Sequence, residues 1–295
     1  MSILLIGGSG RLGTALQRQW QREGRTFNAP SSQELNVLHA PDLARFFAEQ
    51  APAFVIYAAA HTAVDKAEHE ERALAYAMNA QAPETLAILC AQRGIPLLFL
   101  STDYVFGGDR HGYREDDPPS PINVYGASKA EGERRVRLHH PASAFIVRTS
   151  RLFGLPGTSK QAKRSFLDLI LADAEQAAVV PVNPQEEAVP TLVDDLAAHL
   201  TRHFLDEPAR EPGIYHLSNG GDPVSWNGWA QSFVEMAGLP VTITPRDLST
   251  LKRAARRPAH LQLLNAKLPP LRPWREAQQA FFQEHPLSFN PVWRP

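Results

Sequence analysis

Tyr125 and Lys129 stand four residues apart in the stretch SPINVYGASKAEGE, a spacing that puts both side chains on one face of a helix. A free tyrosine titrates near pH 10, but a nearby ammonium favours the phenolate and lowers the tyrosine pKa. Thr102, which ends the apolar run PLLFLST, can hydrogen-bond the oxygen that receives the proton. These residues predict acid catalysis at a carbonyl oxygen; the alternative is a helix tyrosine with its hydroxyl at the surface.

A glycine-rich segment, GGSGRLG at residues 7–13, follows the first apolar run and precedes a helical stretch. It fits GxGxxG through Gly8, Gly10 and Gly13, and GxxGxxG through Gly7, Gly10 and Gly13. Both spacings give a tight turn and a bare backbone where a pyrophosphate approaches the start of a helix, whose amides and dipole favour negative charge. The segment therefore predicts a dinucleotide site rather than a purely structural turn.

The choice of dinucleotide depends on the residue that meets the ribose 2′-hydroxyl. NAD sites place an acidic residue about 20 residues beyond the glycines, but Ser31 and Ser32 occupy that place in NAPSSQE. Without a carboxylate there, a 2′-phosphate is not repelled, and Arg11 can supply a counter-charge. The sequence favours NADPH over NADH, with a merely solvated Arg11 as the alternative.

The order of elements predicts the fold that holds these residues. Four short apolar runs, SILLIG, FVIYAAA, PLLFLST and AFIVRTS, alternate with helical stretches at residues 12–21, 41–50, 71–93 and 124–138. Continuous apolar runs are typical of parallel strands with helices on both faces. We therefore expect an α/β protein with a doubly wound parallel (Rossmann) sheet, and ligands at the carboxyl ends of its strands.

After residue 150 the regular alternation of apolar runs and helical stretches ends, which predicts a smaller C-terminal α/β unit that binds the substrate. The dinucleotide-binding domain should comprise residues 1–150 with a returning segment at about 178–205, and the substrate-binding domain residues 151–177 and 206–295. Helices are expected at residues 166–175, 193–204, 226–237 and after Pro273. The helical spacing of Trp226, Trp229, Phe233 and Met236 favours a core role over a sugar-stacking surface.

Composition excludes several classes of function. The 295 residues carry 30 basic and 31 acidic side chains, so no overall field attracts nucleic acid or an anionic membrane. The apolar runs are far shorter than the roughly 20 residues of a membrane span, and a single cysteine, Cys90, excludes an internal disulfide. His199 and His203 lack a third ligand nearby in the sequence. We expect a cytoplasmic protein with a small-molecule substrate, no metal and no membrane or nucleic-acid partner, and a homodimer is left open.

Several stretches together resemble the short-chain dehydrogenase/reductase superfamily and, within it, the dTDP-4-dehydrorhamnose reductases. They are GGSGRLG, AAAHTAVDKAE at 58–68, LSTDYVFGG at 100–108, SPINVYGASKAEGE at 120–133 and RRPAH at 256–260. AAHTAVDKAE and STDYVF are the most specific, and the likeness runs along the whole chain. It implies NAD(P)H-dependent reduction of the 4-keto group of a nucleotide-activated deoxysugar, with dTDP-4-dehydro-L-rhamnose as the expected substrate.

The resemblance also implies a role for each matching position. Thr102, Tyr125 and Lys129 would be the catalytic group, Tyr125 and Lys129 would also touch the cofactor, and Thr102 and Asp103 would contact the sugar. The positions expected at the cofactor are Gly7, Gly10, Arg11, Leu12 and Gly13 for the phosphates, Ser31 and Asn36 toward the adenosine, and Ala58, Ala59, Ala60 and Thr62 along the ribose and nicotinamide.

Three departures from the family pattern fall on the substrate side. Arg151 stands where the family has a tryptophan against the sugar, QEEAVPT at 185–191 replaces DQxGxPT, and Leu261 lies in RRPAHLQL, which lacks the serine expected after RP. The cofactor and proton-transfer residues are intact, which favours a working reductase with an altered substrate. Two alternatives stay open: a reductase of a different 4-keto nucleotide sugar, and a non-catalytic regulatory subunit that binds the cofactor.

Overall fold

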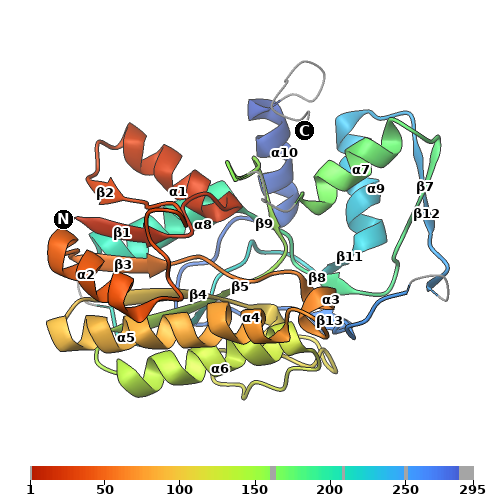
Figure 1. Cartoon of the computed structure of the whole chain (residues 1–295). Coiled ribbons are helices and arrows are strands. Elements are labelled where there is room, and N and C mark those ends of the chain that lie inside the picture. The colour runs from red at the N-terminus through yellow and green to blue at the C-terminus, as the bar shows by residue number, and fades with distance from the viewer. Residues whose placement is uncertain (1, 160–163, 208–209, 249–251, 286–295) are drawn as a thin grey trace.

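The computed structural model of the chain describes residues 2–159, 164–207, 210–248 and 252–285. A six-stranded parallel sheet forms its larger part, in the order β10-β5-β4-β3-β1-β2 (Figure 1). Its strands are β1 (Ile3–Ile6), β2 (Phe27–Asn28), β3 (Phe54–Tyr57), β4 (Leu97–Thr102), β5 (Ala144–Thr149) and β10 (Gly213–His216). The predicted Rossmann-type sheet is confirmed, with β1, β3, β4 and β5 at the four apolar runs.

Helices cover both faces of this sheet. α1 (Arg11–Arg22) and α8 (Val193–Leu200) pack on one face, and α2 (Ala40–Gln50), α5 (Ala82–Arg93) and α6 (Val124–His139) pack on the other (Figure 1). Side chains of β1 alternate between the two cores: Ile3 and Leu5 join that of α1, whereas Leu4 and Ile6 join that of α2 and α5. Burial on both sides explains why each strand reads as a continuous apolar run.

The helix expected over residues 71–93 is interrupted. It consists of α4 (Arg72–Tyr76), the π-helical turn η1 (Ala77–Gln81) and α5, and the short α3 (Val64–Ala67) precedes it. A second π-helical turn, η3 (Thr201–Asp206), continues α8, and a 3₁₀ turn, η2 (Asp103–Val105), follows β4. In the parts of the chain described, every helix is too short or too polar to cross a membrane.

A smaller unit packs beside the carboxyl ends of the sheet strands (Figure 1). Its helices are α7 (Phe166–Ala174), α9 (Trp226–Ala237) and α10 (Trp274–Glu284). Its strands are β6 (Leu152–Phe153) with β9 (Thr191–Leu192), β7 (Val179–Val182) with β12 (Thr242–Pro245), and β8 (Glu187–Ala188) between β11 (Val224–Ser225) and β13 (His260–Leu261). Phe153, Trp229, Trp274 and Phe281 are buried in its core, the last two on the helix expected after Pro273.

Two strands lie on the other side of the boundaries expected from the sequence. β10 falls within the segment assigned to the substrate-binding domain, but it pairs with β5 as an edge of the large sheet. β7 falls within the returning segment, but it pairs with β12 in the smaller unit. Both strands have only four residues, so their partners are chosen by tertiary packing rather than by a local pattern. Residues 286–295, expected in the substrate-binding domain, lie outside the described residues.

Candidate active site

The glycine turn joins β1 to α1 at the carboxyl edge of the sheet. Gly7 has a φ of +90°, and a Cβ there would lie 2.5 Å from the backbone nitrogen of Ala59. A Cβ on Gly13 would lie 2.3 Å from the carbonyl oxygen of Gly7, so close packing requires glycine at both positions. At Gly10 the nearest atom is 3.3 Å from the Cβ position. α1 begins there without a side-chain cap. The loop at 154–159 packs against the same turn, because a Cβ on Gly157 would lie 3.0 Å from the Arg11 nitrogen and the Ser159 amide donates to the Ser9 carbonyl at 3.2 Å.

Ser31 and Asn36 lie exposed in the turns after β2. The Ser31 amide donates to the Glu34 carboxylate at 2.8 Å, and the Glu34 amide is 3.3 Å from the Ser31 hydroxyl that accepts it. The Asn36 side-chain oxygen accepts from the Leu38 amide at 3.1 Å. Sequence reasoning missed Glu34, whose S-x-x-E spacing from Ser31 was the available signal.

Arg11 is not the free counter-charge that the sequence suggests. Its guanidinium donates to the carbonyl oxygen of Gly154 and pairs with Asp168 on α7 at 3.0 Å. The side chain is only 11% exposed. The ion pair therefore holds Arg11 against the smaller unit, while its backbone amide stays in the first turn of α1.

The loop after β3 carries Ala58, Ala59, Ala60 and Thr62 beside the glycine turn. Asn79, buried on η1, fixes this loop: its side-chain oxygen accepts from the His61 amide at 2.9 Å, and its nitrogen donates to the His61 carbonyl at 3.1 Å. The same nitrogen donates to the Ser128 hydroxyl on α6 at 2.9 Å. The loop and the catalytic helix are thereby held together by one amide side chain, on the kind of π-helical turn often found at functional sites.

α6 brings Tyr125 to the same edge. Asn123 caps this helix by accepting the amide of Gly126 at 2.8 Å. A Cβ on Gly126 would lie 2.0 Å from the carbonyl oxygen of Tyr104, so the helix starts in direct contact with η2. The rings of Tyr104 and Tyr125 meet edge to face, with centroids 5.7 Å apart. Tyr104 was not predicted as a site residue, although it lies in the distinctive STDYVF stretch.

The pKa of Tyr125 differs from the sequence prediction. Burial raises it to about 12, and a hydrogen bond with the Thr102 hydroxyl lowers it only in part. Lys129 does not lower this pKa, because its ammonium donates to the carbonyl oxygen of Leu100 at 2.6 Å. Desolvation therefore outweighs the expected charge effect, and Tyr125 is a protonated acid at neutral pH.

The pKa of Lys129 is itself strongly shifted. It is 2% exposed, and its ammonium lies 4.0 Å from the centre of the Phe99 ring. Burial lowers the Lys129 pKa to about 7, although the nearby Glu133 carboxylate acts to raise it. Glu133 is shared with Arg148, at 2.7 Å, and with the Ser101 hydroxyl, at 2.5 Å. Lys129 therefore stands near the midpoint of its titration at neutral pH, a property common among catalytic lysines.

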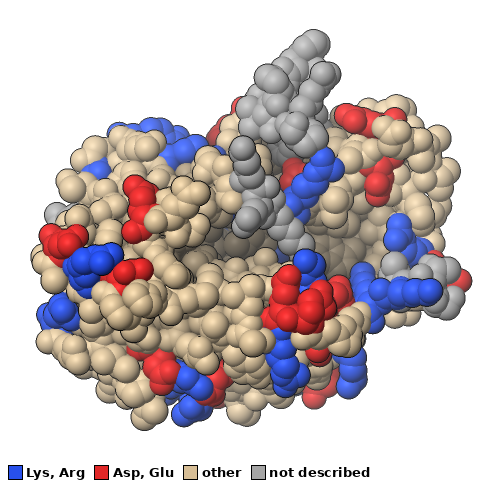
Figure 2. Space-filling model, in the orientation of Figure 1, with Lys and Arg blue, Asp and Glu red and all other residues tan. Residues whose placement is uncertain are grey.

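A cavity of about 230 Å³ opens beside Tyr125, between the sheet edge and the smaller unit. The molecular surface is hollowed between these two parts (Figure 2). The residues lining the cavity are Thr62, Val64, Thr102, Asp103, Tyr104, Tyr125, Arg151, Glu186, Ala188, Trp226, Pro258 and Leu261. The structure thus brings Thr102, Asp103 and Tyr125 together with Thr62 from the predicted cofactor path.

Asp103 is a buried carboxyl group on this cavity. It accepts the Ser150 hydroxyl at 2.5 Å and the Thr102 hydroxyl at 3.1 Å. Burial raises its pKa to about 6, against these hydrogen bonds and the charge of Arg151. Asp103 therefore orients the Thr102 hydroxyl and changes charge just below neutral pH.

Arg151 forms the opposite wall, with a positive φ of 39°. Its guanidinium donates to the carbonyl oxygens of Val224 and Glu186, both at 2.6 Å, and lies 3.9 Å from the centre of the Trp226 ring. Burial lowers the Arg151 pKa to about 10. The two hydrogen bonds and the contact with Trp226 therefore hold the Arg151 cation against the smaller unit.

The aromatic residues of α9 do not all lie in the core. Trp229 and Phe233 are buried as predicted, but Met236 is 40% exposed and Trp226 lines the cavity. Trp226, the first residue of α9, packs against the core beside Phe166 and Trp229 and also borders the cavity next to Arg151, so the core prediction is confirmed for it in part. The core prediction is wrong for the exposed Met236.

The three departures from the family pattern converge on this one cavity. Arg151, Leu261, and Glu186 with Ala188 of the QEEAVPT stretch all line it. The Glu186 carboxylate accepts from the Trp226 ring nitrogen at 3.1 Å and also pairs with Arg253. The departures therefore change one wall together, opposite the unchanged Thr102 and Tyr125.

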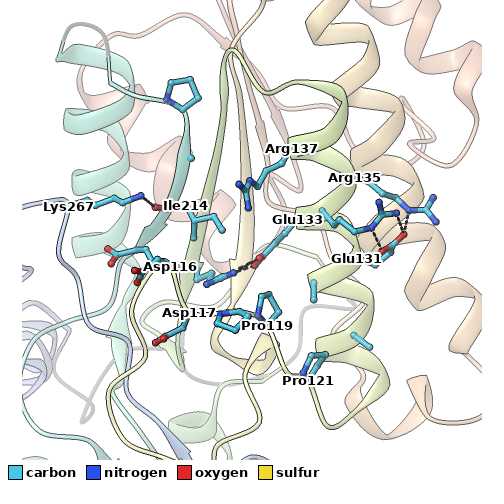
Figure 3. A pocket seen from close by; sticks show the side chains of 18 of the residues that line it. Asp116, Asp117, Pro119, Pro121, Glu131, Glu133, Arg135, Arg137, Ile214 and Lys267 are labelled. Atoms are coloured by element: carbon cyan, nitrogen blue, oxygen red, sulfur yellow. Dashed lines mark hydrogen bonds and ion pairs between the residues drawn. The ribbon is translucent and has the colours of Figure 1, made fainter.

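A larger hollow of about 980 Å³ lies elsewhere, among α6, the loop at 115–121 and β10 (Figure 3). Glu131 and Arg135 pair on its helix side, and the buried Glu133–Arg148 pair stands within it (Figure 3). It is the larger cavity, but the hydroxyl groups able to polarise a carbonyl line the smaller one. Chemistry rather than volume identifies the active site.

Comparisons with known proteins agree with this geometry. The profile of the RmlD substrate binding domain matches residues 1–286. A dTDP-4-dehydrorhamnose reductase of Streptomyces griseus is 38% identical over 93% of this chain and 90% of its own length. A probable dTDP-4,6-dihydroxy-2-methyloxan-3-one 4-ketoreductase of Streptomyces antibioticus is 33% identical over 100% of this chain and 99% of its own.

The fold comparison gives the same result. The crystal structure of dTDP-4-dehydrorhamnose reductase from Bacillus anthracis in complex with NADP has a TM-score of 0.87 at 31% identity, over 96% of this chain and 99% of that one. The chain therefore belongs to the dTDP-4-dehydrorhamnose reductase family, as its glycine turn, its STDYVF stretch and its YxxxK helix predict.

Proposed function

We propose that this chain reduces the 4-keto group of a nucleotide-activated deoxysugar with NAD(P)H, converting dTDP-4-dehydro-L-rhamnose to dTDP-L-rhamnose. The observation that carries the proposal is the convergence of Thr102, Tyr125 and the loop beside the glycine turn on one cavity. The relatives named as dTDP-4-dehydrorhamnose reductases support this substrate.

The glycine turn and the loop after β3 fit a dinucleotide, because the turn has no side chains at Gly7, Gly10 and Gly13 and α1 starts without a side-chain cap. A bound reduced nicotinamide would supply a hydride. The residues proposed to hold the cofactor are Gly7, Gly10, Arg11 through its amide, Leu12 and Gly13 at the phosphates, Ser31 and Asn36 at the adenosine, and Ala58, Ala59, Ala60, Thr62, Tyr125 and Lys129 toward the nicotinamide. NADPH is favoured because the similar Bacillus anthracis structure contains NADP.

Tyr125 is the proposed acid. Its hydroxyl, protonated at neutral pH, gives its proton to the carbonyl oxygen as the carbon receives the hydride, so that the ketone becomes an alcohol. The Thr102 hydroxyl donates its single proton to Asp103 in this structure, so it stabilises the same carbonyl oxygen only after that proton turns from Asp103 to the substrate. Lys129 stabilises the phenolate left on Tyr125 and returns a proton to it, which requires its ammonium to leave the Leu100 carbonyl.

Asp103 and Arg151 are proposed to bind the sugar from opposite sides of the cavity. Both are charged groups at its wall, and Trp226 adds an aromatic surface next to Arg151. This wall also supports a second candidate function, reduction of a different 4-keto nucleotide sugar. The observation favouring it is that each of the three departures from the family pattern contributes residues to this cavity.

The test of the reaction follows NADPH absorbance with dTDP-4-dehydro-L-rhamnose. Tyr125→Phe should lower kcat by about 10²- to 10⁴-fold and leave NADPH affinity nearly unchanged. Tyr215→Phe, which removes a hydroxyl bonded to the Glu211 carbonyl far from the cavity, is the matched control and should retain turnover. Unchanged turnover in Tyr125→Phe would remove this residue from the mechanism.

The same assay separates the alternatives. If Arg151 selects the sugar, Arg151→Trp should shift the ratio of kcat/KM values between dTDP-4-dehydro-L-rhamnose and other 4-keto nucleotide sugars. An unchanged ratio would show that Arg151 is not the selector. Tight NADPH binding without oxidation by any keto sugar would instead favour the regulatory subunit. The homodimer left open by the sequence and the expected cytoplasmic location stay predictions, to be checked by light scattering and cell fractionation.

A further inference from the structure

We propose that His111, Glu187 and His260 form a binding site for a divalent transition metal ion of the Zn²⁺ type, separate from the active site. Each side chain offers one donor atom, and the three donor atoms lie within 4.8 Å of one another. Two imidazoles and one carboxylate, with water in the remaining position, are a ligand set that Zn²⁺ accepts. Sequence reasoning predicted no metal, because His111 is 76 positions from Glu187 and no short spacing links them.

Strand pairing places two of the ligands side by side. β8 and β13 are parallel neighbours, and Glu187 is the register partner of His260. The Nδ1 atom of His260 lies 3.2 Å from the Glu187 carboxylate. Ala188 and Leu261, the next residues along the two strands, line the active-site cavity. Because side chains alternate along a strand, the proposed metal site lies on the reverse face of the cavity wall.

The third ligand, His111, lies on the loop at 108–113, which is hydrogen-bonded to the smaller unit at both ends. The His260 amide donates to the Gly108 carbonyl at 3.2 Å, and the Tyr113 amide donates to the Gln262 carbonyl at 2.7 Å. Gly108 has a φ of +75°, and a Cβ there would lie 2.7 Å from the Ala259 backbone nitrogen. These contacts hold His111 above His260, with ring centroids 4.2 Å apart.

The geometry and charge of this cluster suit a cation. Ligands of a tetrahedral Zn²⁺ stand about 3.4 Å apart when their bonds are about 2.1 Å long. The His260–Glu187 pair already has nearly this spacing, and His111 is exposed, so rotation of its side chain can complete the set. The nearest cation in the sequence, Arg110, lies over the Tyr113 ring and pairs with Asp117 at 2.5 Å. Arg110 therefore does not neutralise the Glu187 carboxylate, whose charge also acts on Arg151 at the cavity side.

A bound ion would join the loop at 108–113 to two strands of the smaller unit. β8 and β13 border the substrate cavity through Ala188 and Leu261, and the loop packs at Gly108 against Pro258, which also lines the cavity. The metal would have a structural role, fixing the strands that form the sugar-binding side of the cavity, and would take no part in proton transfer. The proposal does not depend on the identity of the substrate.

The experiment uses untagged full-length protein stripped of metal and titrated with Zn²⁺ in competition with a chromophoric chelator. One Zn²⁺ per chain should bind, with a rise in Tm. His111→Ala, His260→Ala and the isosteric Glu187→Gln should each weaken binding by at least about 10-fold. His39→Ala is the matched control, because His39 is 57% exposed and pairs with Asp42 elsewhere on the surface.

Two results would overturn the proposal. One is a wild-type protein that binds no Zn²⁺ at millimolar concentration, and the other is binding that survives in all three ligand variants. Each variant is first compared with metal-free wild type in Tm and in NADPH affinity, so that misfolding is recognised. Co²⁺ substitution provides a second readout, since its visible spectrum reports nitrogen and oxygen ligands in a low-coordinate site and should disappear in Glu187→Gln and His260→Ala.

Discussion

Replacing Lys129 by methionine should stabilise the fold most at low pH while it abolishes turnover. Lys129 is 2% exposed, and burial lowers its pKa from 10.5 to about 7. The unfolded chain therefore binds more protons than the folded chain between these two pH values, and stability rises with pH in that window. Below pH 7 the folded protein carries the full cost of a buried ammonium.

The expected change in the free energy of unfolding follows from the pH range between the folded-state and unfolded-state pKa values of Lys129. Each pH unit within it is worth about 1.4 kcal/mol, so wild type should gain about 3 kcal/mol relative to Lys129→Met between pH 6 and pH 9. The methionine also leaves the Leu100 carbonyl without its donor, which costs about 1–3 kcal/mol, and removes the cation–π contact with Phe99, worth about 1 kcal/mol. The loss of the donor to the Leu100 carbonyl shifts the free-energy difference between the two proteins by a nearly constant amount. The cation–π contact exists only while Lys129 is charged and is already included in its folded-state pKa, so it adds no separate pH dependence.

The measurement is urea unfolding of wild type and Lys129→Met at pH 6, 7, 8 and 9, without cofactor. Subtracting one curve from the other cancels the titration of the remaining groups. Lys66→Met is the control, since Lys66 is 60% exposed and pairs with Glu71 at the surface, and its difference from wild type should stay within about 0.5 kcal/mol across the series. A Lys129→Met difference that is equally flat would refute a lowered lysine pKa.

Three further predictions concern the residues around the active site. Gly126→Ala should cost about 3 kcal/mol or more in urea unfolding, because its Cβ would lie 2.0 Å from the Tyr104 carbonyl oxygen; an unchanged midpoint would contradict this contact. Arg11→Met should lower stability by about 1–3 kcal/mol, because Asp168 loses its partner, and should leave the ratio of KM values for NADPH and NADH unchanged. A selective rise in KM for NADPH would restore Arg11 as the 2′-phosphate ligand. The kcat/KM for NADPH should fall as pH rises through about 7, since the Lys129 ammonium is lost there, and a flat profile to pH 9 would show that this charge is not required.

Local patterns predicted the parts of the site that depend on backbone geometry. The glycine spacing at residues 7–13 is required by contacts within the turn and with its neighbouring loop, so it is visible in the sequence. Tyr125 and Lys129 lie on one helix, and Thr102 ends a strand that begins as an apolar run. Such features depend on residues a few positions apart, or on the general rule that strand ends of a parallel sheet meet at one edge.

Long-range packing decided the rest. The sequence could not show that Arg11 pairs with Asp168, 157 positions away, or that Trp226 lies against Arg151 in the cavity. The pKa values of Tyr125 and Lys129 depend on how deeply each is buried and on the Leu100 carbonyl, and no spacing reports either quantity. The sequence by itself determined four strands of the sheet, the glycine turn and the catalytic helix, because their periodicity and conformational needs are local. Charges, cavity walls and ligand clusters belong to the tertiary structure, because desolvation and contact depend on distances in space rather than along the chain.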